Sequence, residues 1–226
     1  MRRADLFKYN IAEKFVSING EGRKAGQLSV FIRFRGCNLN CSYCDTLWAK
    51  SDDCPAETLT ADEILKYILE TKVTNVTLTG GEPLIQKGMY ELIDLLCHNG
   101  LYVEIETNGS ADISAYRNMK IQPSFTLDYK LPSSGMEKAM NMKNYSFISQ
   151  NDTVKFVCGS HDDLEKALEI IKTNHLDERC AVYLSPVFGK IEPSEMVDFM
   201  IEHKLNNVNF QLQLHKFIWD PEQRGV

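Results

Sequence analysis

The chain has 226 residues, of which 43% are hydrophobic and 25% are charged, and its formal net charge is −6. This length suits one well-buried domain, and the composition is that of an ordinary globular protein. The 31 acidic and 25 basic residues form no long run of either sign. A nucleic-acid-binding surface would need clustered Lys and Arg, so we expect no nucleic-acid partner.

The sequence shows no targeting or membrane-spanning pattern. Its first ten residues, MRRADLFKYN, lack an apolar core and a cleavage site. No stretch approaches the roughly 18 consecutive apolar residues of a membrane span. Seven cysteines, an odd number without export features, favour a reducing cytoplasm over a disulfide framework. We therefore expect a cytoplasmic protein that has no membrane partner.

From about residue 28 onward, short β-branched stretches alternate with amphipathic segments. Periodicity predicts strands at residues 28–35, 73–79, 101–107, 125–128, 153–158, 181–184 and 208–214. Helices are predicted at 60–71 behind a capping box, at 89–99 before Gly100, at 162–174, and at 194–204 after Pro193. This alternation predicts an α/β fold, an open, partial (β/α) barrel of about six parallel units, as a single domain over residues 1–226.

Polar residues gather where the predicted strands end, which is where such barrels carry their active sites. Glu104 and Glu106 share one face of their strand because side chains alternate with a period of two. Buried carboxylates would need partners or a ligand. The alternative is that this strand lies at the exposed edge of the partial barrel.

Three cysteines, Cys37, Cys41 and Cys44, lie in the segment GCNLNCSYCDT with the spacing C-x3-C-x2-C. Thiolates are soft ligands for iron–sulfur clusters, which usually take four of them. A fourth ligand at matching spacing is missing, because Cys54 comes ten residues later and the nearest histidine is His98. A cluster held by three thiolates leaves one iron open for chemistry. The alternative is a zinc knuckle or a disulfide pair, although structural zinc sites normally close with four ligands.

The remaining cysteines carry no metal signal. Cys97, Cys158 and Cys180 lie in apolar segments and are expected to be small core residues, whereas Cys54 stays unassigned.

Further along, Thr79-Gly-Gly-Glu-Pro83 follows a predicted strand and precedes a helix. Its two glycines allow a ligand to approach the backbone, whose N–H and C=O groups can bind a charged amino-acid moiety.

The cysteine spacing, the aromatic residue before Cys44 and the GGEP segment together resemble the radical S-adenosylmethionine superfamily. In that superfamily the open iron of a [4Fe–4S] cluster is chelated by the amino and carboxylate groups of S-adenosylmethionine. The resemblance implies that Cys37, Cys41 and Cys44 hold the cluster. It places the cofactor at Gly81, Glu106, Asp128, Tyr129, Lys130, Ser185, Pro186, Val187 and Phe188.

A narrower resemblance covers nearly the whole chain. Ser17-Ile-Asn-Gly-Glu-Gly22, Arg33, Cys44-Asp-Thr46 and the ending Lys216–Val226 resemble the 7-carboxy-7-deazaguanine synthases. Those enzymes convert 6-carboxy-5,6,7,8-tetrahydropterin into 7-carboxy-7-deazaguanine and ammonia, on the path to queuosine. The resemblance implies Mg²⁺ at Thr46, and a substrate site formed by Ile18, Asn19, Gly20, Glu21, Arg33, Thr79 and Val226.

The same resemblance implies a homodimer and a one-electron reductant of the flavodoxin or ferredoxin type. The implied reaction removes the hydrogen at C6 of the pterin, contracts the ring and eliminates ammonia; no general acid or base is assigned. Two departures stand out: Asn19, where Gln is common in the family, and Asp128-Tyr-Lys130, where Ser-Pro-Lys is common.

The residue types also fit that substrate independently of the resemblance. Arg33 offers a planar fork for a carboxylate, unless it merely extends from a strand into solvent. The hydroxyl of Thr46 suits a hard Mg²⁺ ion, unless it caps a helix. The terminal carboxylate of Val226 can accept the paired N–H groups of a pterin, unless the tail is frayed. His215 and Trp219 are expected to pack the last strand against the body.

Two other functions share part of the pattern. A glycyl-radical-enzyme activase has the same cysteine spacing and a similar length, but it needs a surface for a protein loop. The Gly-Glu-Gly segment and the Arg-Gly-Val ending argue against that alternative. A non-catalytic iron–sulfur or zinc protein would have no use for acidic and glycine-rich strand ends in a barrel interior.

Overall fold

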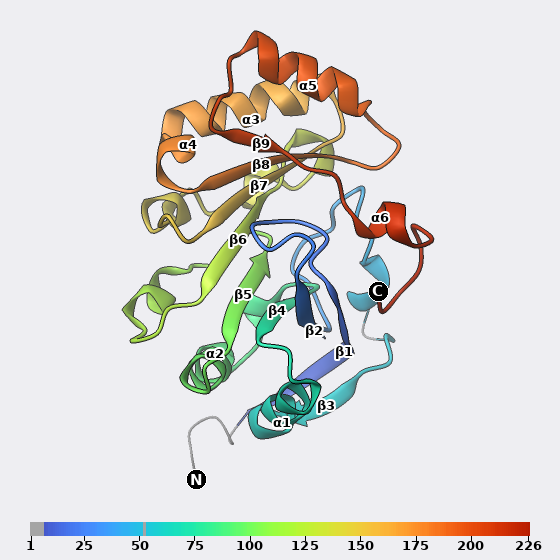
Figure 1. Ribbon diagram of the computed structural model, residues 1–226, viewed down its shortest axis with the longest axis vertical. Coiled ribbons are helices and arrows are strands. Elements are labelled where there is room, and N and C mark those ends of the chain that lie inside the picture. Colours follow the sequence, from blue (N-terminus) through green and yellow to red (C-terminus); the bar gives the residue numbers. More distant parts are fainter. Residues whose placement is uncertain (1–6, 52) are drawn as a thin grey trace.

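The computed structural model describes residues 7–51 and 53–226. These residues form one nine-stranded sheet in the order β3-β1-β2-β4-β5-β6-β7-β8-β9 (Figure 1). From β2 to β9 all neighbouring strands are parallel, whereas β1 pairs antiparallel with both β2 and β3. The strands are β1 (Lys8–Ile18), β2 (Leu28–Phe34), β3 (Glu57–Thr60), β4 (Asn75–Gly80), β5 (Tyr102–Thr107), β6 (Ser124–Tyr129), β7 (Thr153–Cys158), β8 (Ala181–Pro186) and β9 (Val208–Phe210).

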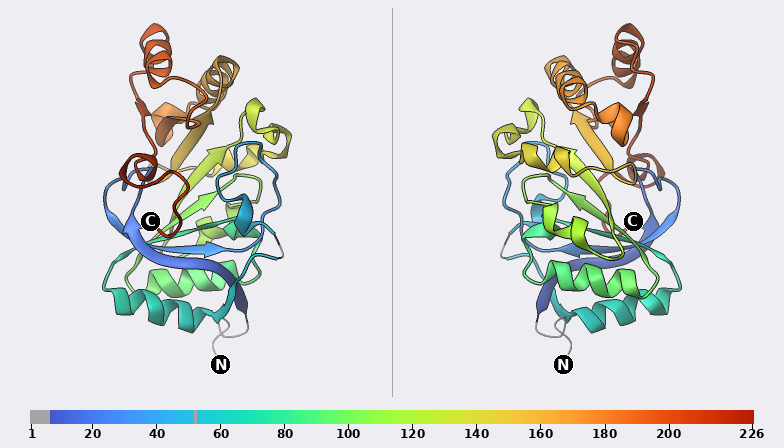
Figure 2. Two further views of the ribbon diagram at one scale, coloured as in Figure 1. Left: turned by 90° about the vertical axis from the view of Figure 1, so that its right-hand side faces the viewer. Right: turned by 90° about the vertical axis from the view of Figure 1, so that its left-hand side faces the viewer.

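Helices follow the parallel strands along the sheet. They are α1 (Ala61–Thr71), α2 (Met89–His98), α3 (His161–Asn174), α4 (Leu176–Arg179), α5 (Pro193–Glu202) and α6 (His215–Ile218). Helices α1 and α2 lie at the end of the sheet near β3, and α3 to α5 lie at the end near β9 (Figures 1 and 2). The predicted single-domain α/β fold with an open, partial barrel is confirmed. Residues 1–6 and 52 of the predicted domain 1–226, and with them most of the N-terminal segment MRRADLFKYN, lie outside the described residues.

One face of the sheet forms the core with the helices. Ile32, Leu78, Ile105 and Leu127 lie on four successive strands and are fully buried in it. Because side chains alternate along a strand, the intervening residues point to the opposite face. That face, called the polar face below, carries Ser29, Arg33, Thr77, Thr79, Glu104, Glu106, Thr126, Asp128, Lys155 and Ser185.

Several local predictions are confirmed by the helix ends. Thr60 and Glu63 form both hydrogen bonds of a capping box at the start of α1. Gly100 follows α2 with a φ of +77°, a left-handed conformation that favours glycine. Pro193 occupies the first turn of α5, where its missing N–H costs nothing.

One strand prediction is wrong, and two strands, β1 and β3, are not predicted. The last strand ends at Phe210 instead of Leu214, because Gln211 and Gln213 bind the β1–β2 loop. The long first strand, β1, is missed because a bulge between Ile11 and Glu13 interrupts its alternation. The edge position considered for Glu104 is also wrong: β5 lies between β4 and β6, and Glu104 is buried.

The buried cysteines lie as expected. Cys97 and Cys158 belong to the core, and Cys180 is half-buried against it. Cys54 is buried as well. Among the described residues, no helix is long and apolar enough to cross a membrane.

Candidate active site

A row of polar side chains crosses the sheet beside the cysteine loop. Arg33 on β2 lies opposite Thr79 on β4 in the parallel register. The Thr79 hydroxyl donates to a carboxylate oxygen of Glu106 on β5 at 2.8 Å. The sheet therefore brings a cation, a hydroxyl and a carboxylate together on adjacent strands, at the carboxyl ends where ligands bind such folds.

The cysteine loop follows β2 and is tied to the ends of several other strands. Gly36 N–H donates to Ala49 C=O at 2.9 Å, which closes the loop on itself. Ser42 donates to the carbonyl groups of Ser134 and Ser133 at 3.0 and 2.7 Å, beyond the end of β6. The hydroxyl of Tyr43 donates to Val157 C=O on β7 at 3.3 Å. These contacts hold the loop over the carboxyl end of the sheet.

All three predicted cluster ligands are free thiols on this loop. Cys37 and Cys41 are half-buried and Cys44 is exposed. The Cys37 sulfur accepts N–H groups from Leu39 at 3.4 Å and from the Asn108 side chain at 3.8 Å. Donors of this kind stabilise a thiolate and are used to tune iron–sulfur clusters. In residues 7–51 and 53–226, no three His, Cys, Asp or Glu side chains gather around the position of a single metal ion.

The GGEP segment packs directly against the start of the cysteine loop. A Cβ on Gly81 would lie 2.0 Å from the carbonyl oxygen of Gly36, so only glycine fits there. Glu82 is fully buried and accepts hydrogen bonds from Leu84 N–H, Asn108 N–H and the Thr107 hydroxyl, at 2.7–2.9 Å. Burial raises the pKa of Glu82, and these hydrogen bonds oppose the rise. Glu82 thereby joins the GGEP segment to the end of β5.

A network of buried charges lies on the β6–β7 side of the polar face. Lys130 Nζ and Lys155 Nζ lie 2.8 and 3.8 Å from Asp128 Oδ2, and Lys155 Nζ lies 3.1 Å from Glu21 Oε2. Burial alone would raise the pKa of Glu21, but Lys155, Gln213 and His215 together outweigh burial and lower it. For Lys155, burial is outweighed by the combined effect of Glu21, Asp128 and Glu106, which raise its pKa. Both charges of this pair therefore persist at neutral pH.

Two buried polar atoms near the network have no hydrogen-bond partner in the described part of the chain. They are Asp128 Oδ1 and Asn19 Nδ2. Asn19 uses its other side-chain atom, Oδ1, to accept from Thr77 at 2.9 Å. A buried polar group without a partner is costly, so each atom fits contact with a bound ligand.

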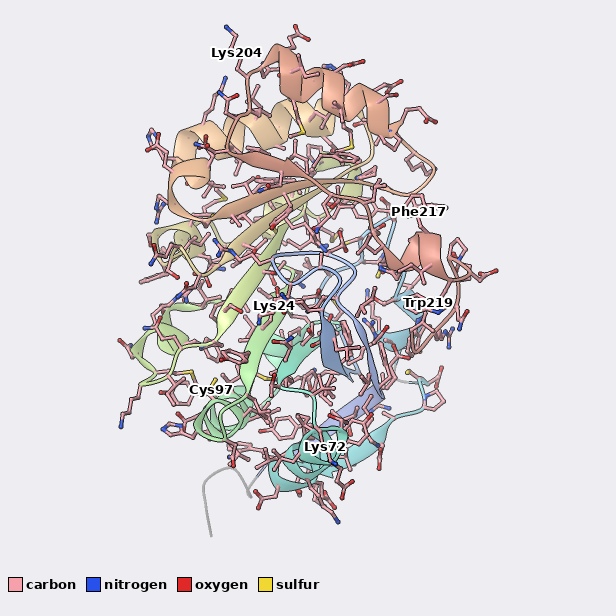
Figure 3. All side chains as sticks on the ribbon, viewed as in Figure 1. Lys24, Lys72, Cys97, Lys204, Phe217 and Trp219 are labelled. Carbon is pink, nitrogen blue, oxygen red and sulfur yellow. The ribbon has the colours of Figure 1, made fainter. Side chains whose placement is uncertain are left out.

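The β1–β2 loop closes the open side of the partial barrel. Gly22 N–H donates to Gln211 at 2.7 Å, and Leu214 N–H donates to Gly20 C=O at 3.1 Å. Glu21 accepts from Ser185 and Gln213 at 3.1 and 3.3 Å. Figure 3 shows Lys24, on the same loop, near the middle of the molecule. The loop thus spans from the first strands of the sheet to the last.

The segment after β8 borders a hollow of about 240 Å³. Ser185 is buried and faces Glu21, whereas Phe188 is half exposed and lies edge-on to Phe217 at 6.1 Å. The hollow is lined by Pro186, Phe188, Gly189, Ile191, Glu192, Pro193, Leu212, Gln213 and Phe217. Tyr129 differs from the other predicted cofactor residues because its side chain is buried between Tyr145 and Phe156 in the core.

The C-terminal segment returns to the cysteine loop. In Figure 3, Phe217 and Trp219 lie on the segment around α6. The guanidinium of Arg224 lies 4.2 Å from the ring centre of Trp48, two residues after Thr46. Val226 is half-buried although the four residues before it are exposed, and Gly225 has a φ of +72°. The last residue is therefore less exposed than the segment that leads to it.

Thr46 precedes the short 3-10 helix Leu47–Ala49 at the position of its cap. Its side chain makes no capping hydrogen bond. The hydroxyl oxygen instead lies 3.7 Å from the Cys44 sulfur. This oxygen therefore remains available for a cation.

Two site residues were missed by the sequence reasoning. Lys155 lies in the middle of the fully buried strand TVKFVC, and a lysine among apolar neighbours was the available signal. Glu13 lies on the unpredicted strand β1 and binds Arg33, with Oε1 at 2.7 Å from Nε. For Glu13 the sequence carried no signal, because its partner depends on how β1 and β2 pair.

Comparison with known proteins identifies the superfamily and the family to which this chain belongs. The family model of the Radical SAM superfamily matches residues 31–202, and the chain belongs to that superfamily. Two relatives are 7-carboxy-7-deazaguanine synthases. The one from Clostridium acetobutylicum is 56% identical, with 96% of this chain and 99% of that protein covered. The one from Chlorobaculum tepidum is 35% identical, with 96% and 97% covered. The chain belongs to the family of 7-carboxy-7-deazaguanine synthases.

A solved structure agrees with this assignment. The crystal structure of QueE from Escherichia coli matches with a TM-score of 0.72 and 26% sequence identity, covering 91% of this chain and 94% of that one. The shared fold includes the mostly parallel sheet on which the polar face lies.

Proposed function

We propose that this chain is a 7-carboxy-7-deazaguanine synthase, which converts 6-carboxy-5,6,7,8-tetrahydropterin into 7-carboxy-7-deazaguanine with loss of ammonia, in queuosine biosynthesis. The observation that carries the proposal is the 56% identity to such a synthase over nearly the full length of both chains. The site supports it, because the row of Arg33, Thr79 and Glu106 lies beside a three-cysteine loop. A glycyl-radical-enzyme activase has no comparable support.

The residues fit a [4Fe–4S] cluster at Cys37, Cys41 and Cys44. The fit rests on three free thiols and on two N–H donors to the Cys37 sulfur. When bound, the cluster and S-adenosylmethionine together supply a 5′-deoxyadenosyl radical, and the protein supplies orientation and exclusion of water.

We further propose how the chain holds S-adenosylmethionine. Gly81 offers its backbone where a side chain cannot fit, and Asp128 Oδ1 is a buried acceptor that has no partner among residues 7–51 and 53–226. Glu106 lies on the same polar face as Asp128, and Lys130 follows β6 and pairs with Asp128. Within the segment Ser185–Phe188, Pro186 and Phe188 border the hollow, which suits an adenine ring. Tyr129 would contribute through its backbone, because its side chain packs in the core.

For the pterin, we propose Arg33 as the partner of the substrate carboxylate and Thr79 as a neighbouring donor. Asn19 Nδ2 is a buried donor without a partner in the described residues, so it suits an acceptor on the ring. Ile18, Gly20 and Glu21 flank Asn19 in the chain, and the half-buried Val226 would offer its carboxylate to the ring N–H groups. Excluding water from this closed space protects a radical from side reactions.

We also propose Mg²⁺ at Thr46, whose hydroxyl is not used in capping. The ion would take its other ligands from substrate oxygens and water. A flavodoxin- or ferredoxin-type electron donor, a homodimer and a reducing cytoplasm complete the proposal. All seven cysteines are free thiols in the structure, which agrees with a reducing compartment.

The test is anaerobic reconstitution with iron and sulfide, followed by reduction with dithionite. 5′-Deoxyadenosine and 7-carboxy-7-deazaguanine are then measured with and without 6-carboxytetrahydropterin. We expect the deazaguanine and ammonia only in the presence of the pterin, and neither in a Cys41→Ser control. Cleavage of S-adenosylmethionine without conversion of the pterin would show that the chain acts on another substrate.

A further inference from the structure

The β-bulge in β1 decides which face of the sheet the strand's side chains reach. Before the bulge, Ile11 lies opposite Phe34 and both are buried on the helix side of the sheet. After it, Glu13 lies opposite Arg33. One extra residue shifts every later side chain to the other face. Without the bulge Ala12 would lie opposite Arg33, so the bulge is what brings Glu13 to the polar face.

Glu13 then forms an ion pair with Arg33 on this face. Its Oε1 accepts from Arg33 Nε at 2.7 Å, and the two side chains are only 18% and 16% exposed. At the next same-face position of the ladder, the rings of Phe15 and Phe31 stack at 5.0 Å, which holds β1 and β2 together. The pair is therefore a fixed feature of the sheet and not an exposed surface contact.

The contact uses one particular edge of the guanidinium. Because the group is planar, a hydrogen bond at Nε sets the direction of the plane and of the two Nη atoms. No acceptor within residues 7–51 and 53–226 forms a hydrogen bond with either Nη atom of Arg33. The pair is also neutral overall. How strongly the pair binds an anionic ligand then depends on where the two Nη groups of Arg33 point, and less on its net charge.

We propose that Glu13 is a positioning residue: it holds Arg33 by Nε so that the Nη edge faces the substrate carboxylate. The inference rests on the proposed function, in which Arg33 binds that carboxylate. Thr79 lies opposite Arg33 in the register and donates to Glu106, so Arg33 begins the polar row described above. Glu13 touches neither substrate nor cofactor and acts only through Arg33.

Two substitutions at this position separate orientation from charge. Glu13→Asp keeps the negative charge but withdraws the oxygen by one methylene, whereas Glu13→Gln keeps an acceptor at the same distance and removes the charge. Lys14→Gln is the matched control, since Lys14 is the next residue on β1 and pairs with Glu57 away from Arg33. Each anaerobically reconstituted enzyme, at equal iron content, is assayed for pterin KM and kcat with saturating S-adenosylmethionine.

We expect Glu13→Asp to raise the pterin KM roughly ten-fold, because misplacing a binding group by about 1 Å is costly. Glu13→Gln should stay within about three-fold of the wild type, since its amide oxygen still accepts from Nε. Lys14→Gln should leave the KM unchanged. In an Arg33→Ala background, Glu13→Asp should cause no further rise, because residues that act through one contact are not additive.

Other results would overturn the inference. A wild-type KM in Glu13→Asp, a Glu13→Gln enzyme as weak as Glu13→Asp, or equal losses with and without Arg33 would each do so. So would an equal loss of S-adenosylmethionine cleavage measured without pterin. If the wild-type enzyme itself fails to turn over the pterin, the proposed function fails. If the Arg33 variants weaken pterin binding but the Glu13 variants do not, the result supports the proposed function and contradicts the positioning role of Glu13.

Discussion

Glu104 offers a direct test of how the polar face is built. This carboxyl group is buried under the β1–β2 loop, and a Cβ on Gly22 would lie 3.3 Å from its Oε1. Burial, followed by the negative charge of Glu106, raises its pKa from 4.5 to about 7. The Thr126 hydroxyl, at 2.6 Å, and the more distant Lys155 and Lys24 only partly offset this rise.

The sign of the pH effect follows from the direction of the pKa. Between pH 4.5 and about 7 the folded chain binds this proton and the unfolded chain does not. The free energy of unfolding therefore does not suffer from Glu104 below pH 4.5. It decreases as the pH rises from 4.5 to about 7, and the loss is complete above about pH 7. A rise from 4.5 to about 7 corresponds to roughly 3 kcal/mol at pH 8.

We predict that Glu104→Gln removes this penalty, because a neutral amide still accepts the Thr126 hydrogen bond. At pH 8 the variant should be about 3 kcal/mol more stable than the wild type, or roughly 6–12 °C higher in Tm for a chain of this length. At pH 4.5 the two should be nearly equal. Loss of the cluster contributes equally to the unfolding of both proteins, so it cancels when their stabilities are subtracted.

The assay is anaerobic thermal unfolding of the reconstituted proteins at pH 4.5, 6 and 8. Glu165→Gln, a change of an exposed carboxylate on α3, is the control and should show no pH-dependent gain. A Tm difference between Glu104→Gln and the wild type that stays the same at pH 4.5 and pH 8 would refute the reasoning. The carboxylate would then be paired or solvated in a way that its surroundings do not indicate.

Four further predictions concern the proposed ligands. Cys41→Ser should abolish the cluster, as measured by iron content and visible absorption; full iron content would contradict the assignment. Thr46→Ala should lose stimulation by Mg²⁺ while still binding S-adenosylmethionine, and unchanged Mg²⁺ dependence would leave Thr46 without a role at the ion. Arg33→Lys should weaken pterin binding by ~1.5–3 kcal/mol, or roughly 10- to 100-fold, because an ammonium cannot replace the guanidinium fork; an equal loss of uncoupled cofactor cleavage would point to a structural role. Extending the chain beyond Val226 should weaken pterin binding but keep the cluster, whereas wild-type affinity would mean that the terminal carboxylate does not touch the substrate.

Local signals in the sequence predicted much of the architecture. The capping box at Thr60 and the glycine after α2 are confirmed because they depend on hydrogen bonds within a few residues. The strand at residues 153–158 is confirmed to the residue, since it is short, apolar and bounded by polar turns. Strand β1 was not predicted, because its bulge breaks the alternation on which such predictions rest.

The functional class was readable from the sequence because its chemistry is carried by short segments. Three thiols at fixed spacing and the GGEP turn lie within about 45 residues and need no distant partner to be noticed. The sequence predicted only part of the role of the two glycines in the GGEP segment. The structure adds that Gly81 is packed against the backbone of Gly36, so the glycine serves the cysteine loop itself as well as any ligand.

The sequence by itself thus determined the alternation of strands and helices, the cysteine loop and the polar strand ends, since each follows from neighbouring residues. Only the tertiary structure decided which polar side chains meet. Glu21 reaches Lys155 across 134 residues, and Gly22 reaches Gln211 across 189. Glu13 reaches Arg33 because one extra residue in β1 turns its side chain to the polar face. Period alone assigns a residue to a face, but its partner depends on the order, register and bulges of strands that pair across the whole chain.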